Sequence, residues 1–154
     1  MTSPAERLAV LGLTLPPVPA PVAAYVPAVR AGGFVYTSGQ LPTVDGKLPA
    51  VGKVGAEVSA ADAAGLARTC ALNAIAAAAS AAGGLAAIGR IVKVTGFVAS
   101  APGFSGQPQV VNGASELLLE VFGEDGRHAR SAVGVAELPL NAPVEVELIA
   151  ELRS

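Results

Sequence analysis

The sequence is poor in the residues that build disulfides and soft-ligand metal sites. Its 154 residues include one cysteine, Cys70, and one histidine, His128, in unrelated segments. One cysteine cannot form an intramolecular disulfide, so a reducing cytoplasm is the default compartment. No spaced carboxylate motif replaces the missing soft ligands, and we therefore expect no metal and no metal catalysis. Cys70 lies within an alanine-rich segment, where we expect a small core residue rather than a nucleophile.

Positive charge and aromatic residues are also scarce. Charged residues make up 14% of the chain and aromatic residues 4%, with a formal net charge of −2. The sequence pI is about 5.3. A nucleic-acid binder is expected to show a basic surface stripe, which this composition argues against.

A strongly apolar membrane segment is missing as well. The segment Thr69–Gly89 carries no charge and is long enough to span a bilayer. It holds only four strongly inserting residues, worth about −2.4 kcal/mol at roughly −0.6 kcal/mol each. We therefore predict an alanine-rich helix of a cytoplasmic protein with no membrane contact.

What the chain does contain is enough apolar content for one domain. Hydrophobic residues make up 52% of it, and many of them are alanine and valine. Ser3, Pro4 and Glu6 predict a capped helix that ends near Gly12. A proline-rich connector follows over Pro16–Pro21, so we divide the chain into an N-terminal segment, residues 1–22, and one domain, residues 23–154.

The domain alternates between strand and helix patterns. Gly32-Gly33 predicts a hairpin between two strands, and Ser59 and Gly83 delimit a long helix. A second helix begins near Pro108 and ends at Gly123. The predicted strands cover Ala23–Arg30, Phe34–Ser38, Arg90–Ala99, Ala129–Glu137 and Val144–Leu152. We predict an α+β fold, a mixed β-sheet with its two main helices packed on one face.

The last predicted strand has an acidic face. Val144, Val146 and Leu148 alternate with Glu145 and Glu147, so the carboxylates share the opposite face. Unpaired carboxylates cannot lie beneath a dry helix layer. That face must meet water, a partner subunit or a cation such as Arg130.

Arg130 is the most informative charged residue because it begins a strand of small and apolar residues. Its planar guanidinium requires a partner and suits a carboxylate. That partner could be Glu145 or Glu147 across the adjacent strand, or it could be a bound ligand; spacing alone favours neither. His128 has no nucleophile-elbow serine to serve, so we expect it at the surface or at a rim.

Several ordered motifs resemble those of the RidA family, also called YjgF. Ala129–Val133, Leu138-Pro139 and Val144–Ala150 resemble its C-terminal signature, and Tyr36–Pro42 resembles its second signature. Three short segments fall at matching places around and between these: Tyr25-Val26, Ile91–Val94 and Val111-Asn112. The resemblance extends from about Ala23 to Leu152.

The resemblance implies a chorismate-mutase-like fold that assembles as a homotrimer with sites between subunits. Known members hydrolyse reactive 2-imino acids, formed from enamines, to 2-keto acids and ammonia, with no cofactor. Carried over by position, Arg130 would bind the substrate carboxylate and Glu145 would position or activate water. The remaining lining residues would be Tyr25, Ser38, Gly39 and Asn112.

Departures from the family pattern keep two other functions open. Ala132 stands where many members have cysteine, and Pro102–Gln109 resembles an enlarged loop of a divergent branch. A non-catalytic protein that binds small carboxylates or keto acids is therefore the alternative. An endoribonuclease, suggested by the older family name L-PSP, ranks last because the chain is acidic and has few aromatic residues.

Overall fold

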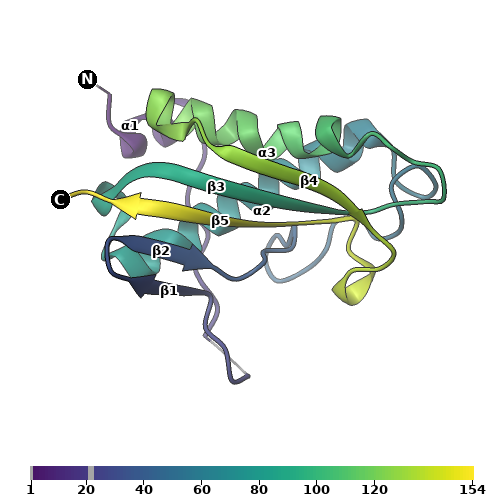
Figure 1. Cartoon of the computed structure of the whole chain (residues 1–154), viewed down its shortest axis with the longest axis horizontal. Coiled ribbons are helices and arrows are strands. Elements are labelled where there is room, and N and C mark those ends of the chain that lie inside the picture. Colours follow the sequence, from purple (N-terminus) through teal and green to yellow (C-terminus); the bar gives the residue numbers. More distant parts are fainter. Residues whose placement is uncertain (1, 21–22) are drawn as a thin grey trace.

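The computed structural model describes residues 2–20 and 23–154. The end of the predicted connector at Pro21, and with it the proposed division after residue 22, lie outside the described residues. A five-stranded sheet runs along the molecule in the order β1-β2-β5-β3-β4 (Figure 1). Its strands are β1 (Ala28–Ala31), β2 (Phe34–Thr37), β3 (Ile88–Ala99), β4 (Ala129–Val135) and β5 (Val144–Leu152).

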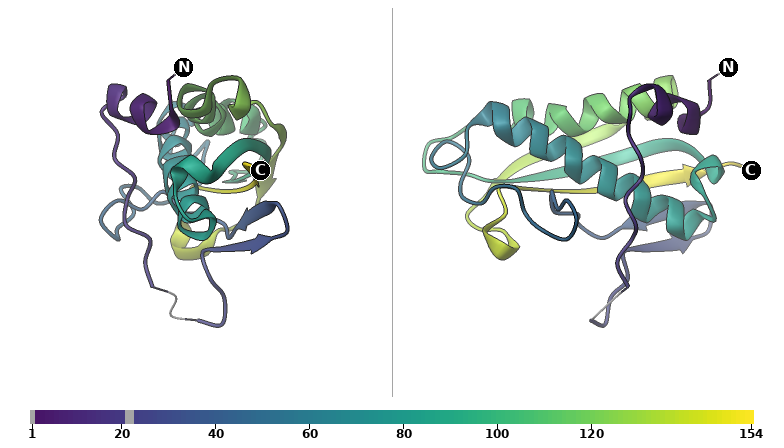
Figure 2. Two further views of the ribbon diagram at one scale, coloured as in Figure 1. Left: turned by 90° about the vertical axis from the view of Figure 1, so that its left-hand side faces the viewer. Right: turned by 180° about the vertical axis from the view of Figure 1, so that it is seen from behind.

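The sheet is mixed, as predicted. β4 runs parallel to β3, and the other neighbouring pairs are antiparallel. Helices α2 (Ala60–Ala82) and α3 (Gln107–Phe122) cover one face, and no helix of the described residues covers the other (Figure 2). The short helix α1 (Pro4–Val10) packs against α3. Short 3₁₀ turns η1 (Leu85–Ala87), η2 (Gly123–Gly126) and η3 (Pro139–Asn141) complete the elements.

The predicted helix ends are confirmed by their caps. The hydroxyl of Ser3 accepts from the Glu6 backbone N–H, and the Glu6 carboxylate accepts from the Ser3 N–H, which forms a capping box. Ser59 caps α2 by accepting from the Asp62 N–H. Gly83 ends α2 with φ of 89°, a left-handed conformation that glycine adopts without a Cβ clash.

Small residues allow the two long helices to pack closely on the sheet. Cys70 is fully buried in α2 among alanines, as expected. A Cβ added at Gly113 of α3 would collide with the Ala64 carbonyl oxygen of α2. Within the sheet, a Cβ at Gly96 would lie 2.7 Å from one methyl carbon of Val111. Glycine at these two crossings therefore sets the distance between the layers.

One predicted neighbour relationship is wrong. We expected the strand Ala129–Glu137 to be adjacent to Val144–Leu152, but β3 lies between β4 and β5. The reason is that β3, α3 and β4 form a crossover unit, which places β4 parallel to β3 at the sheet edge. β5 then fills the space on the other side of β3. β4 also ends at Val135, two residues before the predicted end.

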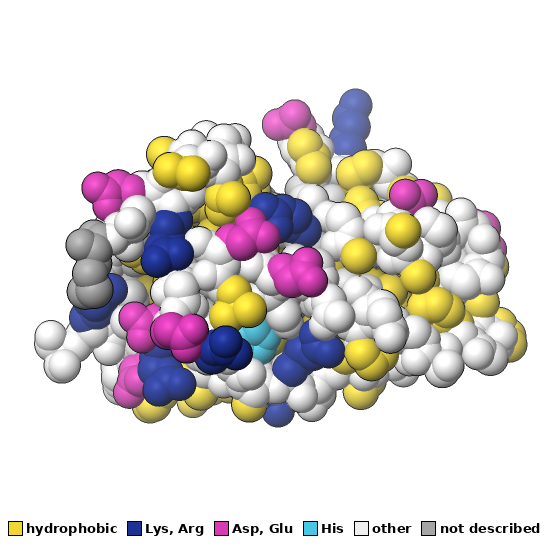
Figure 3. Space-filling model, turned by 90° about the horizontal axis from the view of Figure 1, so that it is seen from above, with side chains coloured by type: hydrophobic (Ala, Val, Ile, Leu, Met, Phe, Trp, Pro, Cys, Tyr) yellow, Lys and Arg dark blue, Asp and Glu magenta, His cyan; other side chains and the backbone are white. Residues whose placement is uncertain are grey.

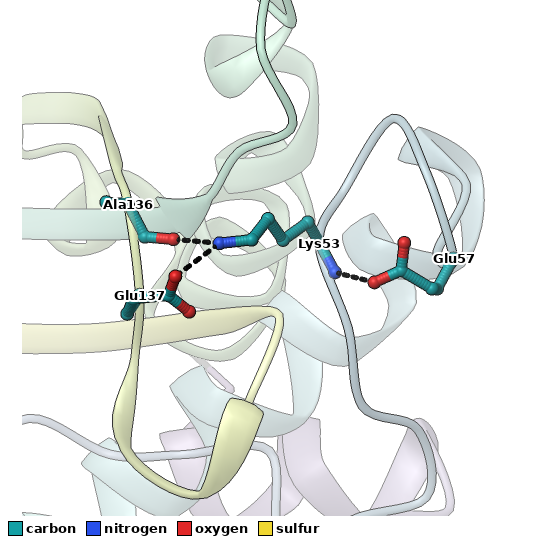
Figure 4. Close-up of polar contacts among 4 residues, drawn as sticks. All are labelled: Lys53, Glu57, Ala136 and Glu137. Atoms are coloured by element: carbon teal, nitrogen blue, oxygen red, sulfur yellow. Dashed lines mark hydrogen bonds and ion pairs between the residues drawn. The ribbon is translucent and has the colours of Figure 1, made fainter.

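The long loop before α2 is tied to the segment that follows β4. The Lys53 ammonium forms an ion pair of 2.7 Å with Glu137 Oε1 and donates to the Ala136 carbonyl, as Figure 4 shows. The Lys53 N–H donates to Glu57 Oε1 at 3.1 Å, which holds the loop tip. The Gly52 N–H donates to the Asn141 carbonyl at 2.9 Å. These contacts fix the end of the sheet where β4 leaves it.

Among residues 2–20 and 23–154, no helix has the length and apolar character needed to cross a bilayer.

Candidate functional site

Arg130 lies on the helix-covered side of edge strand β4. Its register partner on β3 is the buried Val94, so both side chains point toward α3. Arg130 Nη1 donates to Asn112 Oδ1 at 2.8 Å and to Ser115 Oγ at 3.2 Å, and Nη2 donates to the Pro108 carbonyl at 3.5 Å. Residues 108, 112 and 115 lie on one side of α3, which the crossover places beside β4. We call Asn112, Ser115, His128 and Arg130 the Arg130 cluster.

No carboxylate of the described residues pairs with Arg130. The three ion pairs found there are Lys53–Glu137, Arg68–Glu120 and Arg127–Glu124. Of the two alternatives left open for Arg130, the ion pair with Glu145 or Glu147 within one chain is excluded, because β3 separates β4 from β5. All of its hydrogen-bond partners are neutral, so its charge is available for an anion.

Glu145 lies on the opposite, helix-free face of the sheet. Its register partner on β3 is Phe97, three residues from Val94 and hence on the other side of the pleat. Glu145 is half-buried; burial, and next the charge of Glu147, raise the pKa of its carboxyl. No hydrogen bond to its carboxylate is found among the described residues. Glu145 therefore has open acceptor positions.

Gly39 makes room for this carboxylate. A Cβ at position 39 would lie 2.7 Å from Glu145 Cδ and would collide with Oε2. The neighbouring Ser38 donates from Oγ to the Val26 carbonyl at 2.6 Å, which holds the segment carrying Tyr25. Tyr25 itself is 68% exposed. We call Tyr25, Ser38, Gly39 and Glu145 the Glu145 cluster.

The six residues predicted for the site thus form two groups in one chain. Arg130 donates a hydrogen bond to Asn112, and the Glu145 carboxylate fills the space that a side chain at Gly39 would take. The two groups lie on opposite faces of the sheet, with β3 between Arg130 and Glu145. One chain does not bring the two charged residues together.

Two members of the Arg130 cluster, Ser115 and His128, were not predicted. Ser115 Oγ lies 2.9 Å from His128 Nε2, and His128 Nδ1 lies 2.7 Å from the Gly126 carbonyl oxygen. Burial lowers the pKa of His128, and the charge of Arg130 lowers it further against the effect of the Gly126 carbonyl. His128 is half-buried yet reaches the surface, where basic side chains lie on both sides of the histidine (Figure 3). The three-residue spacing of Asn112 and Ser115 on α3 was the available signal.

The described residues contain no group of three His, Cys, Asp or Glu side chains that could hold a metal ion. The fold and the two clusters define a class: a mixed-sheet α+β protein with an arginine that no described carboxylate neutralises on one face and a half-buried carboxylate on the other. Residues 5–152 match the family described as "YjgF/chorismate mutase-like, putative endoribonuclease". The chain belongs to this RidA/YjgF family.

The chain is also similar to individual proteins over most of its length. Protein TCP17 of Trypanosoma cruzi is 44% identical over 97% of this chain and 94% of its own length. The crystal structure of Atu1372 from Agrobacterium tumefaciens, a protein of unknown function, has a TM-score of 0.89 at 48% identity and covers 96% of this chain and 91% of its own. Escherichia coli TdcF with bound serine has a TM-score of 0.65 at 29% identity, over 89% of this chain and 94% of its own.

Proposed function

We propose that this protein hydrolyses reactive 2-imino acids to 2-keto acids and ammonia, with Arg130 holding the substrate carboxylate. The observation that carries the proposal is the state of Arg130: neutral acceptors hold its guanidinium, and no described carboxylate neutralises it. Its remaining N–H groups suit a planar carboxylate, which can accept two parallel hydrogen bonds. The related TdcF, which has been crystallised with serine, supports a small ligand that carries a carboxylate.

The reaction needs few groups beyond this clamp. The imine carbon is already electrophilic, so orientation of the substrate and of one water molecule supplies much of the rate. Water adds to that carbon, and the new C–O bond becomes the keto group as nitrogen leaves as ammonia. Glu145, with its open acceptor positions and raised pKa, accepts a hydrogen bond or a proton from the attacking water. No metal or organic cofactor takes part in this scheme.

Two subunits together would form the complete site. The helix-free sheet face exposes apolar side chains, with Val29 52%, Tyr36 46% and Val133 42% exposed. Such a face, rimmed by carboxylates, is suited to burial against other copies of the chain. We propose a homotrimer in which the Arg130 cluster of one subunit faces the Glu145 cluster of the next, with Tyr25, Ser38, Gly39 and Asn112 lining the cleft.

A coupled turnover assay tests the function. An amino-acid dehydratase generates the imine in situ, and the rate of keto-acid formation is measured with and without this protein. We expect the wild-type protein to accelerate keto-acid release and Arg130→Ala to abolish the acceleration, because the substrate carboxylate would lose its charged partner. Absence of acceleration with several amino-acid precursors would rule out the deaminase function.

A non-catalytic binder of small keto acids is the second candidate. Ala132, two residues after Arg130 on the same side of β4, packs against the core and supplies no thiol to the cleft. Calorimetric binding of a keto acid that depends on Arg130, together with no turnover, would select this candidate. The position of Arg130 would then serve binding alone.

A further inference from the structure

The hydrogen bonds behind Arg130 form a chain whose direction is fixed at both ends. A guanidinium only donates, so Arg130 Nη1–H must point to Ser115 Oγ. A carbonyl only accepts, so His128 must carry its proton on Nδ1, where it faces the Gly126 oxygen. In the neutral ring, His128 Nε2 is then an acceptor, and the Ser115 hydroxyl donates to it across 2.9 Å. The Arg130 donor and the Gly126 acceptor together fix the direction of the hydrogen bond between Ser115 and neutral His128.

We propose that Ser115 and His128 are positioning residues for the Arg130 anion site, and that anion binding there is coupled to proton uptake by His128. This inference rests on the proposed role of Arg130 as the carboxylate clamp. Neutral His128 accepts the hydrogen bond from the Ser115 hydroxyl, which leaves an oxygen lone pair of Ser115 pointing toward Arg130. Together with Asn112 Oδ1 at 2.8 Å, that lone pair fixes the plane of the guanidinium.

The coupling follows from the charges around His128. On β4, the positive charge of Arg130 disfavours protonation of His128. In the turn before β4, Glu124 and Arg127 pair with each other at 2.9 Å. On α3, Glu116 follows Ser115, and Glu120 pairs with Arg68 of α2 at 2.9 Å. A carboxylate bound at Arg130 would offset the guanidinium charge and therefore raise the pKa of His128.

Protonation would also turn the Ser115 hydroxyl. The protonated Nε2 would donate to Ser115 Oγ, which would then accept from both His128 and Arg130. The Ser115 hydroxyl would keep its proton and could then donate a hydrogen bond to the bound anion. Affinity should therefore rise as the pH falls from the His128 pKa of the complex to the His128 pKa of the free protein, which lies below its ordinary value.

Ser115 is better placed for this role than for nucleophilic attack. It lies in the middle of α3, away from the sharp strand-to-helix turn that exposes a nucleophilic serine. Its histidine is oriented by a carbonyl rather than by a carboxylate, so the imidazolium that attack would produce has no negative partner there.

Nuclear magnetic resonance of the ring nitrogens tests the proposal, because His128 is the only histidine of the chain. The wild-type protein is titrated with pH in the absence and presence of 2-oxobutanoate, and its affinity for this keto acid is measured by calorimetry. We expect the Nδ1–H tautomer in the free protein and a higher His128 pKa in the complex. Arg130→Ala should remove that ligand-induced rise.

Three variants separate positioning from protonation. Ser115→Ala and His128→Ala should weaken 2-oxobutanoate binding about tenfold, because each leaves a polar partner of the chain unsatisfied. His128→Gln keeps an acceptor for the Ser115 proton but cannot be protonated in this range, so it should bind within about threefold of wild type at neutral pH. It should lose the rise in affinity at lower pH. Ser80→Ala, which removes a helix hydroxyl bonded to the Ala77 carbonyl, is the control.

The outcomes distinguish this inference from the proposed function. If wild-type protein binds 2-oxobutanoate through Arg130 but Ser115→Ala and His128→Ala bind as tightly, the positioning role is overturned and the clamp stands. An unchanged His128 pKa in the complex overturns the coupling alone. Failure of the wild-type protein to bind 2-oxobutanoate overturns the clamp, and this inference with it.

Discussion

At the scale of single residues, the Glu145 carboxylate owes its properties to two neighbours. Gly39 leaves the space that its side chain occupies, since a Cβ there would lie 2.7 Å from Glu145 Cδ. Glu147, on the same strand face, adds a like charge that raises the pKa of Glu145 in addition to the effect of burial. Neither effect depends on a hydrogen bond to the carboxylate. The acceptor positions of Glu145 are thus left for water.

Replacing Glu147 should shift the pH dependence of turnover. If Glu145 must be ionised to accept a proton from water, the rate falls as the pH drops through its raised pKa. Glu147→Gln removes the like charge and lowers that pKa, so the fall should move to lower pH, with burial still keeping the pKa above its ordinary value. A pH–rate profile of keto-acid formation measures the shift.

Glu151→Gln is the matched control, because Glu151 is an exposed carboxylate on the same face of β5 and is not a cause of the Glu145 pKa shift. The pH–rate profile of Glu151→Gln should fall at acidic pH at the same place as that of the wild-type protein. If Glu147→Gln also leaves the fall in place, Glu145 is not the group that titrates.

At the scale of elements, the sequence predicted what local pattern controls. The bounds of β5 follow from the alternation after Pro143, and those of α2 follow from Ser59 and Gly83. The neighbour of β4 was predicted wrongly, because strand pairing depends on a crossover through α3 that no local pattern reveals. Arg130 and Asn112 were assigned to one site by the family resemblance, whereas Ser115 and His128 were missed as site residues for the same reason that the neighbour of β4 was. Their contacts exist only after α3 has packed beside β4.

The packing of α3 on α2 can be tested at Gly113. Gly113→Ala should lower the free energy of unfolding by about 1–3 kcal/mol, because the added methyl group would collide with the Ala64 backbone, which cannot rotate away. Gly65→Ala in α2 is the control: its Cβ would meet no atom within 4 Å, and it should stabilise the helix by up to about 1 kcal/mol. Urea denaturation measures both. Equal stabilities would contradict this close helix crossing.

At the scale of the whole molecule, one chain holds the two clusters of predicted site residues apart. The Arg130 cluster lies on the helix-covered face at the β4 edge, and the Glu145 cluster lies on the helix-free face. The exposed apolar side chains of that second face, among them Val29, Tyr36 and Val133, offer a surface for other copies. Our central claim is that adjacent subunits of a homotrimer combine the two clusters.

Complementation between two inactive variants tests this claim most directly. Arg130→Ala and Glu145→Ala are purified separately and also co-expressed, and keto-acid formation is measured for each preparation. In randomly mixed cyclic trimers, about a quarter of the interfaces pair an intact Arg130 with an intact Glu145. We expect the mixture to recover about a quarter of wild-type activity, with each variant alone inactive. A co-expressed mixture of confirmed mixed trimers that stays as inactive as its components would contradict a site shared between subunits.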